Sequence, residues 1–577
     1  MRGPDVGMNT RRSRAWLAVP VAVALIAASC GDDDDGSSAD TTPAAGTTAD
    51  GTDAPTTSAS SGPADTAGDE TGTTPAVSGP ATTIDRDEGT DDIDPDATLR
   101  VATNYPAPAT LDPHKVPSPI ASMVSLGLLY DRLTHIGSDM SVEPMLATEW
   151  EFSADGTTVT FTLRDDATFA DGTPVDAAAV KASLERGKTL EGSTAVAALV
   201  AIETVTADDP THVSITTNRP AADLPATLAG IEGSIIDPAH IDDPALETTP
   251  AGSGPYVLDQ FTPTESVSFT RRDGYWDAAA QQAAAVQIIG MPTDPTRLNA
   301  LRTGEIDLMM TTLGQYEEVS GLGDGFVTST YTAASPYTMY FNTGIANLDN
   351  PTIRQALNYA IDRDAISDAL LGGQCQAINQ ILTEAYDGHV DAPEQDYTYD
   401  PDKARELLGE AGVPDGFSIR VLVPAGLTLY ENIATALQAQ LADIGVQVEL
   451  VPQDSTQIFP SWSAGTFDGF VNVRATRPSA SATLEAAYLN PARYPGPVPA
   501  GFTEAVSESR DPLLSDSELT AALETASGLT NSQAMDLYIC AAPALWTASE
   551  NVVGADTMGW SSFSAFGDLR YVGVAAG

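Results

Sequence analysis

Basic residues are scarce in this sequence. Its 577 residues hold 27 lysines and arginines against 80 aspartates and glutamates, and the formal net charge at pH 7 is −53. A surface this acidic repels nucleic-acid phosphates and anionic lipid headgroups. Nucleic-acid binding is therefore excluded as a function, and any contact with a membrane has to be made by other means.

Long apolar runs are also missing, except at the N-terminus. Residues 16–28 form an uncharged apolar run of thirteen, and four arginines precede it: Arg2, Arg11, Arg12 and Arg14. This order is typical of a signal peptide, and the run is too short for a stable membrane anchor. Elsewhere no run approaches the roughly 18 apolar residues of a membrane-spanning helix, so we expect no second span.

Cysteine occurs only three times, and the first copy stands at the end of the apolar run. Cys30 follows Ala27, Ala28 and Ser29 and is followed almost at once by four aspartates. This end resembles a bacterial lipoprotein signal, in which the cysteine is lipidated and becomes the mature N-terminus, although Ala27 stands where that family usually has leucine. The resemblance implies a signal peptide over residues 1–29 and a lipid anchor on Cys30. Conventional cleavage a little further downstream is the alternative.

Aromatic residues and leucine are absent from residues 31–94. This segment carries sixteen acidic residues and a single base, Arg86. It cannot bury enough apolar surface to offset the entropy lost on ordering, so we predict a disordered acidic linker over residues 30–94. As a flexible coil the linker would span roughly 45 Å.

From residue 95 onward the sequence is that of a folded protein. Val159, Phe161 and Leu163 alternate with threonines, which predicts a half-buried strand. The stretch 418–452 predicts a strand, a crossover helix and a second strand, and such a unit pairs its strands in parallel. The chain is too long for a single core. We therefore predict an α/β fold of at least two lobes, with mixed sheets flanked by helices.

Five motifs follow one another in this region. They are Met145–Arg186, "GSGPY" at Gly252–Tyr256, "RRDGYW" at Arg271–Trp276, "RLNALRTGEIDLM" at Arg297–Met309, and Tyr337–Ile366. In this order they resemble the family 5 extracytoplasmic solute-binding proteins, which are the oligopeptide-, dipeptide- and nickel-binding components of ABC importers. The resemblance covers essentially all of residues 97–577.

The resemblance implies a two-lobed periplasmic-binding-protein fold of type II, with an extra subdomain in lobe 1. We expect lobe 1 over residues 95–330 with its subdomain at about 120–250, lobe 2 over residues 331–544, and a return to lobe 1 over residues 545–577. The lobes would close on a peptide or small organic solute and deliver it to the permease subunits of an ABC transporter. We expect an extracytoplasmic monomer without a cofactor, lipid-anchored to the outer face of the cell membrane.

No catalytic motif contradicts this interpretation. Neither HExxH nor GxSxG occurs, and none of the five histidines pair at metal-ligand spacing: His114, His135, His212, His240 and His389. We therefore expect no enzyme and no metal site. Two alternatives stay open: a secreted enzyme whose catalytic residues come from distant parts of the chain, and an adhesin or sensory scaffold with the same fold.

The other two cysteines are Cys375 and Cys540. An exported protein enters an oxidising compartment, which favours a disulfide between them. Two separate buried thiols are the alternative. A bridge over so long a loop would stabilise the protein by about 4–5 kcal/mol in the chain-entropy model.

The region that binds solute in the family departs from its pattern here. In peptide-binding members, an aspartate of the second lobe receives the peptide's amino group. The matching region, Phe467–Leu489, has no aspartate after Gly469 and offers Asn472, Arg474 and Arg477 instead. We predict that these residues bind the solute, with the two arginines on a carboxylate or phosphate. The alternative is that one or both arginines pair with acidic residues of the protein.

Four further residues are candidates for the site. Asn104 and Tyr105 lie in the loop after the first predicted strand, and in the family this loop faces the cleft. Trp462 and Trp546 could provide stacking surface for a solute. The alternatives are loop solvation for Asn104, partial burial for Tyr105 and core packing for the two tryptophans.

Overall fold

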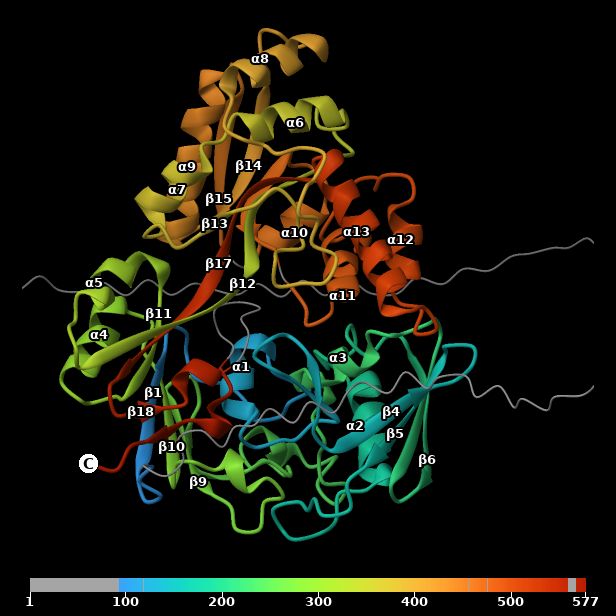
Figure 1. Cartoon of the computed structure of the whole chain (residues 1–577), viewed down its shortest axis with the longest axis vertical. Helices are drawn as coiled ribbons and strands as arrows, with labels where there is room; N and C mark the ends of the chain where they lie inside the picture. Colours follow the sequence, from blue (N-terminus) through green and yellow to red (C-terminus); the bar gives the residue numbers. More distant parts are fainter. Residues whose placement is uncertain (1–92, 118, 455, 475, 559–566) are drawn as a thin grey trace, which may run out of the picture. The chain divides into compact units, whose positions relative to one another are not determined.

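The computed structural model describes residues 93–117, 119–454, 456–474, 476–558 and 567–577, which all belong to the unit formed by residues 74–577. Strands and helices alternate along this unit, and its sheets contain both parallel and antiparallel pairs (Figure 1). The predicted α/β fold with mixed sheets is therefore confirmed. The predicted signal peptide, Cys30 and almost all of the predicted linker lie outside the described residues.

One sheet of eleven strands runs through the described part of the chain. Its two longest strands, β12 (Phe326–Phe341) and β17 (Asp536–Ser549), are antiparallel neighbours (Figure 1). β17 pairs with β11 through Leu545–Ala548, whereas β12 pairs with β16 through Tyr337–Phe341. The two long strands therefore connect the two ends of the sheet. We name the β11 end lobe 1 and the β16 end lobe 2.

Lobe 1 is built on strands in the order β11–β1–β10–β9–β8, with β1 parallel to both of its neighbours. Its core contains Leu99 and Val101 of β1, Phe269 of β9 and Trp546 of β17. The elements are β1 (Thr98–Thr103), α1 (Pro119–Leu126), β2 (Thr134–Ile136), β3 (Val142–Pro144), β8 (Tyr256–Thr262), β9 (Ser266–Arg271), β10 (Ala285–Gly290), α4 (Asp294–Arg302), β11 (Leu308–Thr311) and α5 (Tyr316–Ser320).

A second sheet, of four antiparallel strands in the order β4–β5–β7–β6, forms a subdomain of lobe 1. Val159, Phe161 and Leu163 of β5 are buried and alternate with half-buried threonines, as their spacing predicts. The elements are β4 (Ala147–Phe152), β5 (Thr158–Leu163), α2 (Ala177–Thr189), β6 (Ile202–Asp209), β7 (His212–Thr217), α3 (Leu224–Leu228) and the short 3₁₀-helix η2 (Ile231–Gly233).

Lobe 2 contains the predicted strand–helix–strand unit. β14 and β15 pair in parallel, and Ile433, Leu437 and Leu441 of the connecting helix α9 are buried in the core of the lobe. The elements are α6 (Pro351–Tyr359), α7 (Arg363–Leu370), β13 (Gln376–Ala377), α8 (Pro401–Glu410), β14 (Ser418–Pro424), α9 (Thr428–Asp443), β15 (Gln447–Gln453), α10 (Ile458–Ser463) and β16 (Gly469–Val473).

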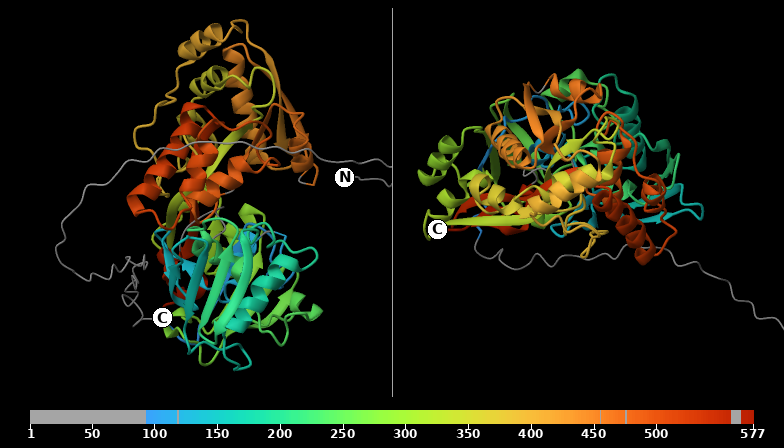
Figure 2. Two further views of the ribbon diagram at one scale, coloured as in Figure 1. Left: turned by 90° about the vertical axis from the view of Figure 1, so that its right-hand side faces the viewer. Right: turned by 90° about the horizontal axis from the view of Figure 1, so that it is seen from above.

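A group of helices follows β16 in lobe 2. α11 (Ala480–Leu484) runs directly into a π-helix, η6 (Glu485–Leu489), and α12 (Phe502–Glu508) and α13 (Asp516–Ser532) pack beside it. In Figure 1 and in the left view of Figure 2, these orange and red helices lie next to the teal subdomain of lobe 1. This is where the two lobes approach each other.

A disulfide joins Cys375 to Cys540 within lobe 2, at a sequence separation of 165 residues. Both cysteines lie in the core of the lobe, and the residue after Cys375 begins β13, which pairs with β17. The bridge therefore holds β13 to one of the two strands that connect the lobes.

Candidate functional site

A cavity of about 330 Å³ lies between the two lobes. Lobe 1 lines it with residues of α1, of β2, of the segment before β6 and of the segment from Arg219 to Glu232. Lobe 2 lines it with residues between Thr476 and Asn490. A solute held here would touch both lobes, and it would therefore stabilise their closed arrangement. Small-molecule sites begin at about this size.

Most of the cavity wall is apolar. Lobe 1 contributes Met123, Ile136, Val200 and Ile231, and lobe 2 contributes Leu489, with alanines from both lobes between them. These side chains lose contact with water when a solute enters, so an apolar part of the solute is bound favourably. The few polar and charged groups in the wall are left to decide which solute fits.

The lobe 2 wall includes the π-helix η6. Glu485, Ala486 and Leu489 line the cavity, whereas Ala487 and Tyr488 are buried in the core of the lobe. π-helical turns are rare in proteins and occur frequently at functional sites. The one here places an acidic and an apolar side chain on the cavity.

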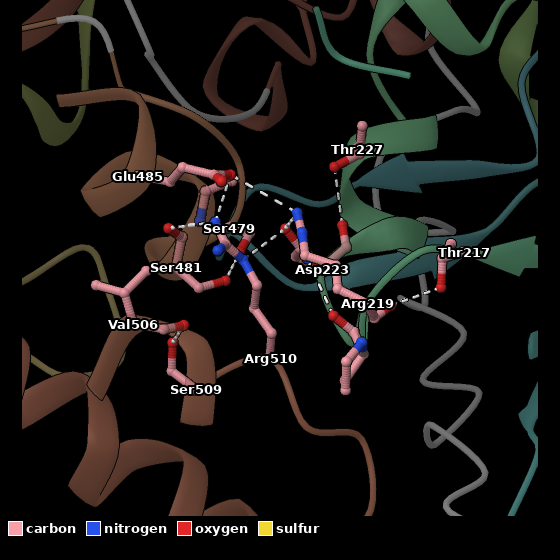
Figure 3. A network of polar contacts seen from close by, with 12 residues as sticks. Thr217, Arg219, Asp223, Thr227, Ser479, Ser481, Glu485, Val506, Ser509 and Arg510 are labelled. Atoms are coloured by element: carbon pink, nitrogen blue, oxygen red, sulfur yellow. Dashed lines mark hydrogen bonds and ion pairs between the residues drawn. The ribbon is translucent and has the colours of Figure 1, made fainter. Parts of the chain in front are cut away.

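One group of charged side chains at the cavity forms a network between the lobes (Figure 3). Arg510 Nε of lobe 2 lies 3.3 Å from Asp223 Oδ2 of lobe 1, and Arg219 Nη2 of lobe 1 lies 3.6 Å from Glu485 Oε2 of lobe 2. Within lobe 2, Arg510 also donates a hydrogen bond of 2.6 Å to Glu485. A backbone hydrogen bond of 3.0 Å from Ala222 to the Arg510 carbonyl crosses between the lobes beside it. In this network two arginines neutralise two carboxylates.

Arg477 lines the cavity from lobe 2 and is held through its backbone. Its N–H donates a hydrogen bond of 2.8 Å to Thr483 Oγ1, and its carbonyl accepts one of 2.8 Å from Tyr386 Oη. The guanidinium makes no hydrogen bond or ion pair with the described residues. It is therefore a positive charge that is available to a solute.

Glu232 lines the cavity from lobe 1, in η2. Its carboxylate folds back over Gly230, where an added Cβ atom would lie 2.6 Å from Glu232 Oε2. Burial raises the pKa of the Glu232 carboxyl, and a hydrogen bond with its own backbone and, to a smaller extent, the charge of Arg477 oppose that rise. The protein alone thus compensates this carboxylate only in part.

In the described ranges, no group of three or more histidine, cysteine, aspartate or glutamate side chains could hold a metal ion. No helix in these ranges is long and apolar enough to cross a membrane.

Residues 141–493 match the family described as bacterial extracellular solute-binding proteins, family 5. The chain belongs to this family. Among its curated relatives, the glutathione-binding protein GsiB of Escherichia coli K12 is 30% identical over 370 residues, which cover 63% of this chain and 70% of GsiB. GsiB of Salmonella typhimurium is 30% identical over 372 residues with the same coverage. The predicted membership of the family is confirmed.

Solved structures of similar fold come from several bacteria. AgaA with agropinic acid, from A. tumefacien R10, has a TM-score of 0.70 at 25% identity and covers 83% of this chain and 99% of AgaA. NikA of Brucella suis with Fe(III)-EDTA has a TM-score of 0.74 at 22% identity, with coverage of 83% and 100%. The predicted periplasmic-binding-protein fold of this solute-binding protein is therefore confirmed.

Arg474 does not line the cavity of this solute-binding protein. Its Nη2 and Nε atoms donate hydrogen bonds of 2.6 and 2.8 Å to the carboxylate of Asp536, and its guanidinium lies 3.5 Å from the ring centroid of Tyr340. Its side chain is 2% exposed. Arg474 thus has the alternative role, an ion pair with an acidic residue of the protein, and this replaces the expected contact with a solute.

The two tryptophans also belong to the core. Trp462 and Trp546 are fully buried, and neither lines the cavity. Trp462 donates a hydrogen bond of 2.9 Å to the Arg493 carbonyl, and Trp546 packs in the core of lobe 1. Neither ring has an open face, so the core-packing alternative replaces the expected stacking surface.

Asn104, Tyr105 and Asn472 lie outside the cavity wall as well. Tyr105 packs against the core of lobe 1, and burial raises its pKa. Asn472 lies on β16, where its Oδ1 accepts a hydrogen bond of 2.8 Å from the N–H of Val473. Contacts of these three residues with a solute remain predictions.

Of the seven predicted solute-binding residues, Arg477 alone lines the cavity. Sequence reasoning missed Glu232 and the network residues Arg219, Asp223 and Glu485. Glu485 lies within the region Phe467–Leu489 that the family pattern had singled out. No motif marks Glu232, because its place at the cavity depends on how the subdomain packs against lobe 2.

Proposed function

We propose that this protein captures a short peptide or small organic solute in the cavity between its lobes and delivers it to the permease subunits of an ABC transporter. The observation that carries the proposal is a cavity whose walls come from both lobes. A solute that contacts both walls favours the closed arrangement, and the permease can recognise that arrangement. The names of the relatives support a solute of this size, since GsiB is a glutathione-binding protein and DppA of Helicobacter pylori was solved with the peptide STSA.

The same proposal includes the protein's location outside the cell and a role without a catalysed reaction. The family is extracellular. A lipid on Cys30 would hold the monomer to the membrane, and the acidic segment after it would let the folded lobes search some tens of ångströms around the permease. Capture and release need no bond in the solute to be broken, so the protein acts as a carrier and not as an enzyme.

The test is native mass spectrometry of the purified protein, followed by unfolding to release and identify a bound small molecule. Ala486→Trp places an indole in the cavity wall on η6 and should abolish the bound mass. Ala521→Trp on the exposed face of α13 is the matched control and should retain it.

Two results would contradict this function. A bound molecule that persists in the Ala486→Trp variant would place the site elsewhere. A molecule that the protein converts to a product would support the enzyme alternative instead.

A further inference from the structure

Two charges of the cavity wall, one from each lobe, are left without an ion pair among the described residues: Glu232 and Arg477. We propose that the cavity is specific for a zwitterion with an apolar body, which places its cationic group at Glu232 of lobe 1 and its anionic group at Arg477 of lobe 2. This inference rests on the proposed function, because it names the class of solute that the same cavity takes.

The other charged groups at the cavity are already neutralised by the protein. Arg219 and Asp223 form an ion pair of 3.2 Å in lobe 1, and Arg510 lies within 3.3 Å of Asp223 and 2.6 Å of Glu485. The network holds as many positive as negative charges. Among the described residues, a solute therefore meets two charges that still need a partner, and they have opposite signs.

The surroundings of Glu232 favour a cation. Its carboxylate lies in a wall that is mostly apolar, and burial raises its pKa, so the ionised form is poorly stabilised by the protein. Gly230 leaves the space that the carboxylate occupies. An ammonium or guanidinium group placed here would form a charge-assisted hydrogen bond, which is stronger than a neutral one.

The surroundings of Arg477 favour an anion. Its main chain is tied to Thr483 and Tyr386, so the guanidinium projects from a fixed point. Glu232 and Arg477 line the same cavity without forming an ion pair with each other. A guanidinium fork that is free in a cavity matches a carboxylate in bidentate geometry.

A solute with one charge would leave the other wall charge without a partner. Closing the lobes over such a solute removes that charge from water without compensation, and this cost disfavours it. The apolar surface between the two charges then binds the body of the solute. A zwitterion with an apolar body is the class of solute that matches Glu232, Arg477 and the apolar surface between them.

The test uses three matched sets of probes on the purified full-length protein. The first set contains amino acids and dipeptides with apolar side chains, such as leucine and leucyl-leucine. The second set contains their N-acetyl derivatives, which lack the cation, and the third contains their carboxamides, which lack the anion. Thermal shift and calorimetry should show binding by members of the first set, and at least tenfold weaker binding by the matching members of the other two.

Variants assign each end of the solute to its residue. Glu232→Gln should remove the preference for a free amine over the N-acetyl form, and Arg477→Gln should remove the preference for a free carboxylate over the amide. Gly230→Ala should act like a weaker form of Glu232→Gln, because its methyl group displaces the Glu232 carboxylate. The controls are Glu149→Gln on β4 and Arg271→Gln on β9, both exposed and away from the cavity, and these should keep both preferences.

The outcomes separate this inference from the proposed function. Equal binding of the zwitterions and of either blocked set would overturn the zwitterion assignment, as would a preference that survives in Glu232→Gln or Arg477→Gln. No binding by any of the three sets would also overturn it. If native mass spectrometry then still shows a molecule that Ala486→Trp excludes, the proposed function stands with a solute of another class. If it shows none, both fail.

Discussion

Arg474 and Arg477 lie three residues apart in sequence, and the structure gives them opposite environments. Arg474 is 2% exposed and is held by Asp536, whose side chain is fully buried. Arg477 lines the cavity, and its guanidinium has no ion pair among the described residues. Both arginines follow Val473, the last residue of β16. One therefore stabilises lobe 2, and the other is available to a solute.

The two arginines differ in whether the protein supplies an ion-pair partner. Both arginines are strongly basic and both lie near acidic residues, so residue type does not separate them. Burial lowers the pKa of Arg474, but the ion pair with Asp536 raises it overall, which leaves a fully compensated pair. A charge that has a matched partner stabilises the fold. A charge that lacks one is available to a bound solute.

The largest expected effect comes from removing the compensated arginine. In Arg474→Met, the one side-chain partner that the described residues still give the buried Asp536 carboxylate is the Tyr488 hydroxyl, 2.9 Å away. Breaking a buried ion pair in this way should lower the free energy of unfolding by about 3–5 kcal/mol. Urea unfolding followed by circular dichroism measures it.

Arg477→Met is the matched control for that experiment. Its side chain lines a mostly apolar cavity and makes no hydrogen bond or ion pair with the described residues. Only its longer-range attraction to Glu232 is lost, so the free energy of unfolding should change by less than about 0.5 kcal/mol. Equal losses in the two variants would contradict the division of roles between these arginines.

A second buried ion pair, in lobe 1, contacts a histidine whose protonation changes with pH. Arg186 Nη2 lies 2.7 Å from Asp112 Oδ2, and His114 Nδ1 lies 2.9 Å from Arg186 Nη1. Burial and the Arg186 charge lower the pKa of His114 from 6.5 to about 4, although Asp112 opposes the shift. In the unfolded chain His114 takes up a proton near pH 6.5, whereas in the folded protein it does so only near pH 4.

The stability that depends on His114 is therefore complete above pH 6.5 and is lost as the pH falls toward 4. The loss should reach about 3 kcal/mol, and it should level off below pH 4 as far as this group is concerned. Unfolding free energies measured at intervals across this range test it. His114→Gln should flatten the slope. A slope that is the same in the variant and in the unchanged protein would remove His114 as its source.

Much of the fold could be predicted from the sequence because it depends on local patterns. The alternation at Val159, Phe161 and Leu163 decides which face of β5 is buried. Asn350 and Pro351 are the cap and the first residue of α6, as their chemistry favours. The five ordered motifs indicated the family, and residues 141–493 match it.

The site could be predicted only in part, for a physical reason. Arg477, which lines the cavity, was a candidate because the family pattern points to that stretch of lobe 2. Arg474 was misplaced because its partner Asp536 is 62 residues away in sequence, and only the fold brings them together. Glu232 carries no local signal, since its role depends on a subdomain that packs against the other lobe. Contacts between distant segments decide which charges are paired, and a sequence pattern does not contain them.

The smallest expected effect concerns Arg510, whose environment is intermediate between those of Arg474 and Arg477. Arg510 is compensated like Arg474, but one of its partners, Asp223, belongs to the other lobe. When the lobes open, water can solvate the charges that Arg510→Met leaves behind, so the loss should fall on the closed arrangement and not on the fold. The closed arrangement should lose about 1–2 kcal/mol of stability. Small-angle X-ray scattering of the solute-free protein should then show a larger radius of gyration, and the solute should bind about tenfold more weakly. Arg405→Met, on an exposed arginine of α8, is the control. An unchanged radius together with lowered unfolding stability would show that the network supports the fold of one lobe, as Arg474 does, and does not hold the two lobes together.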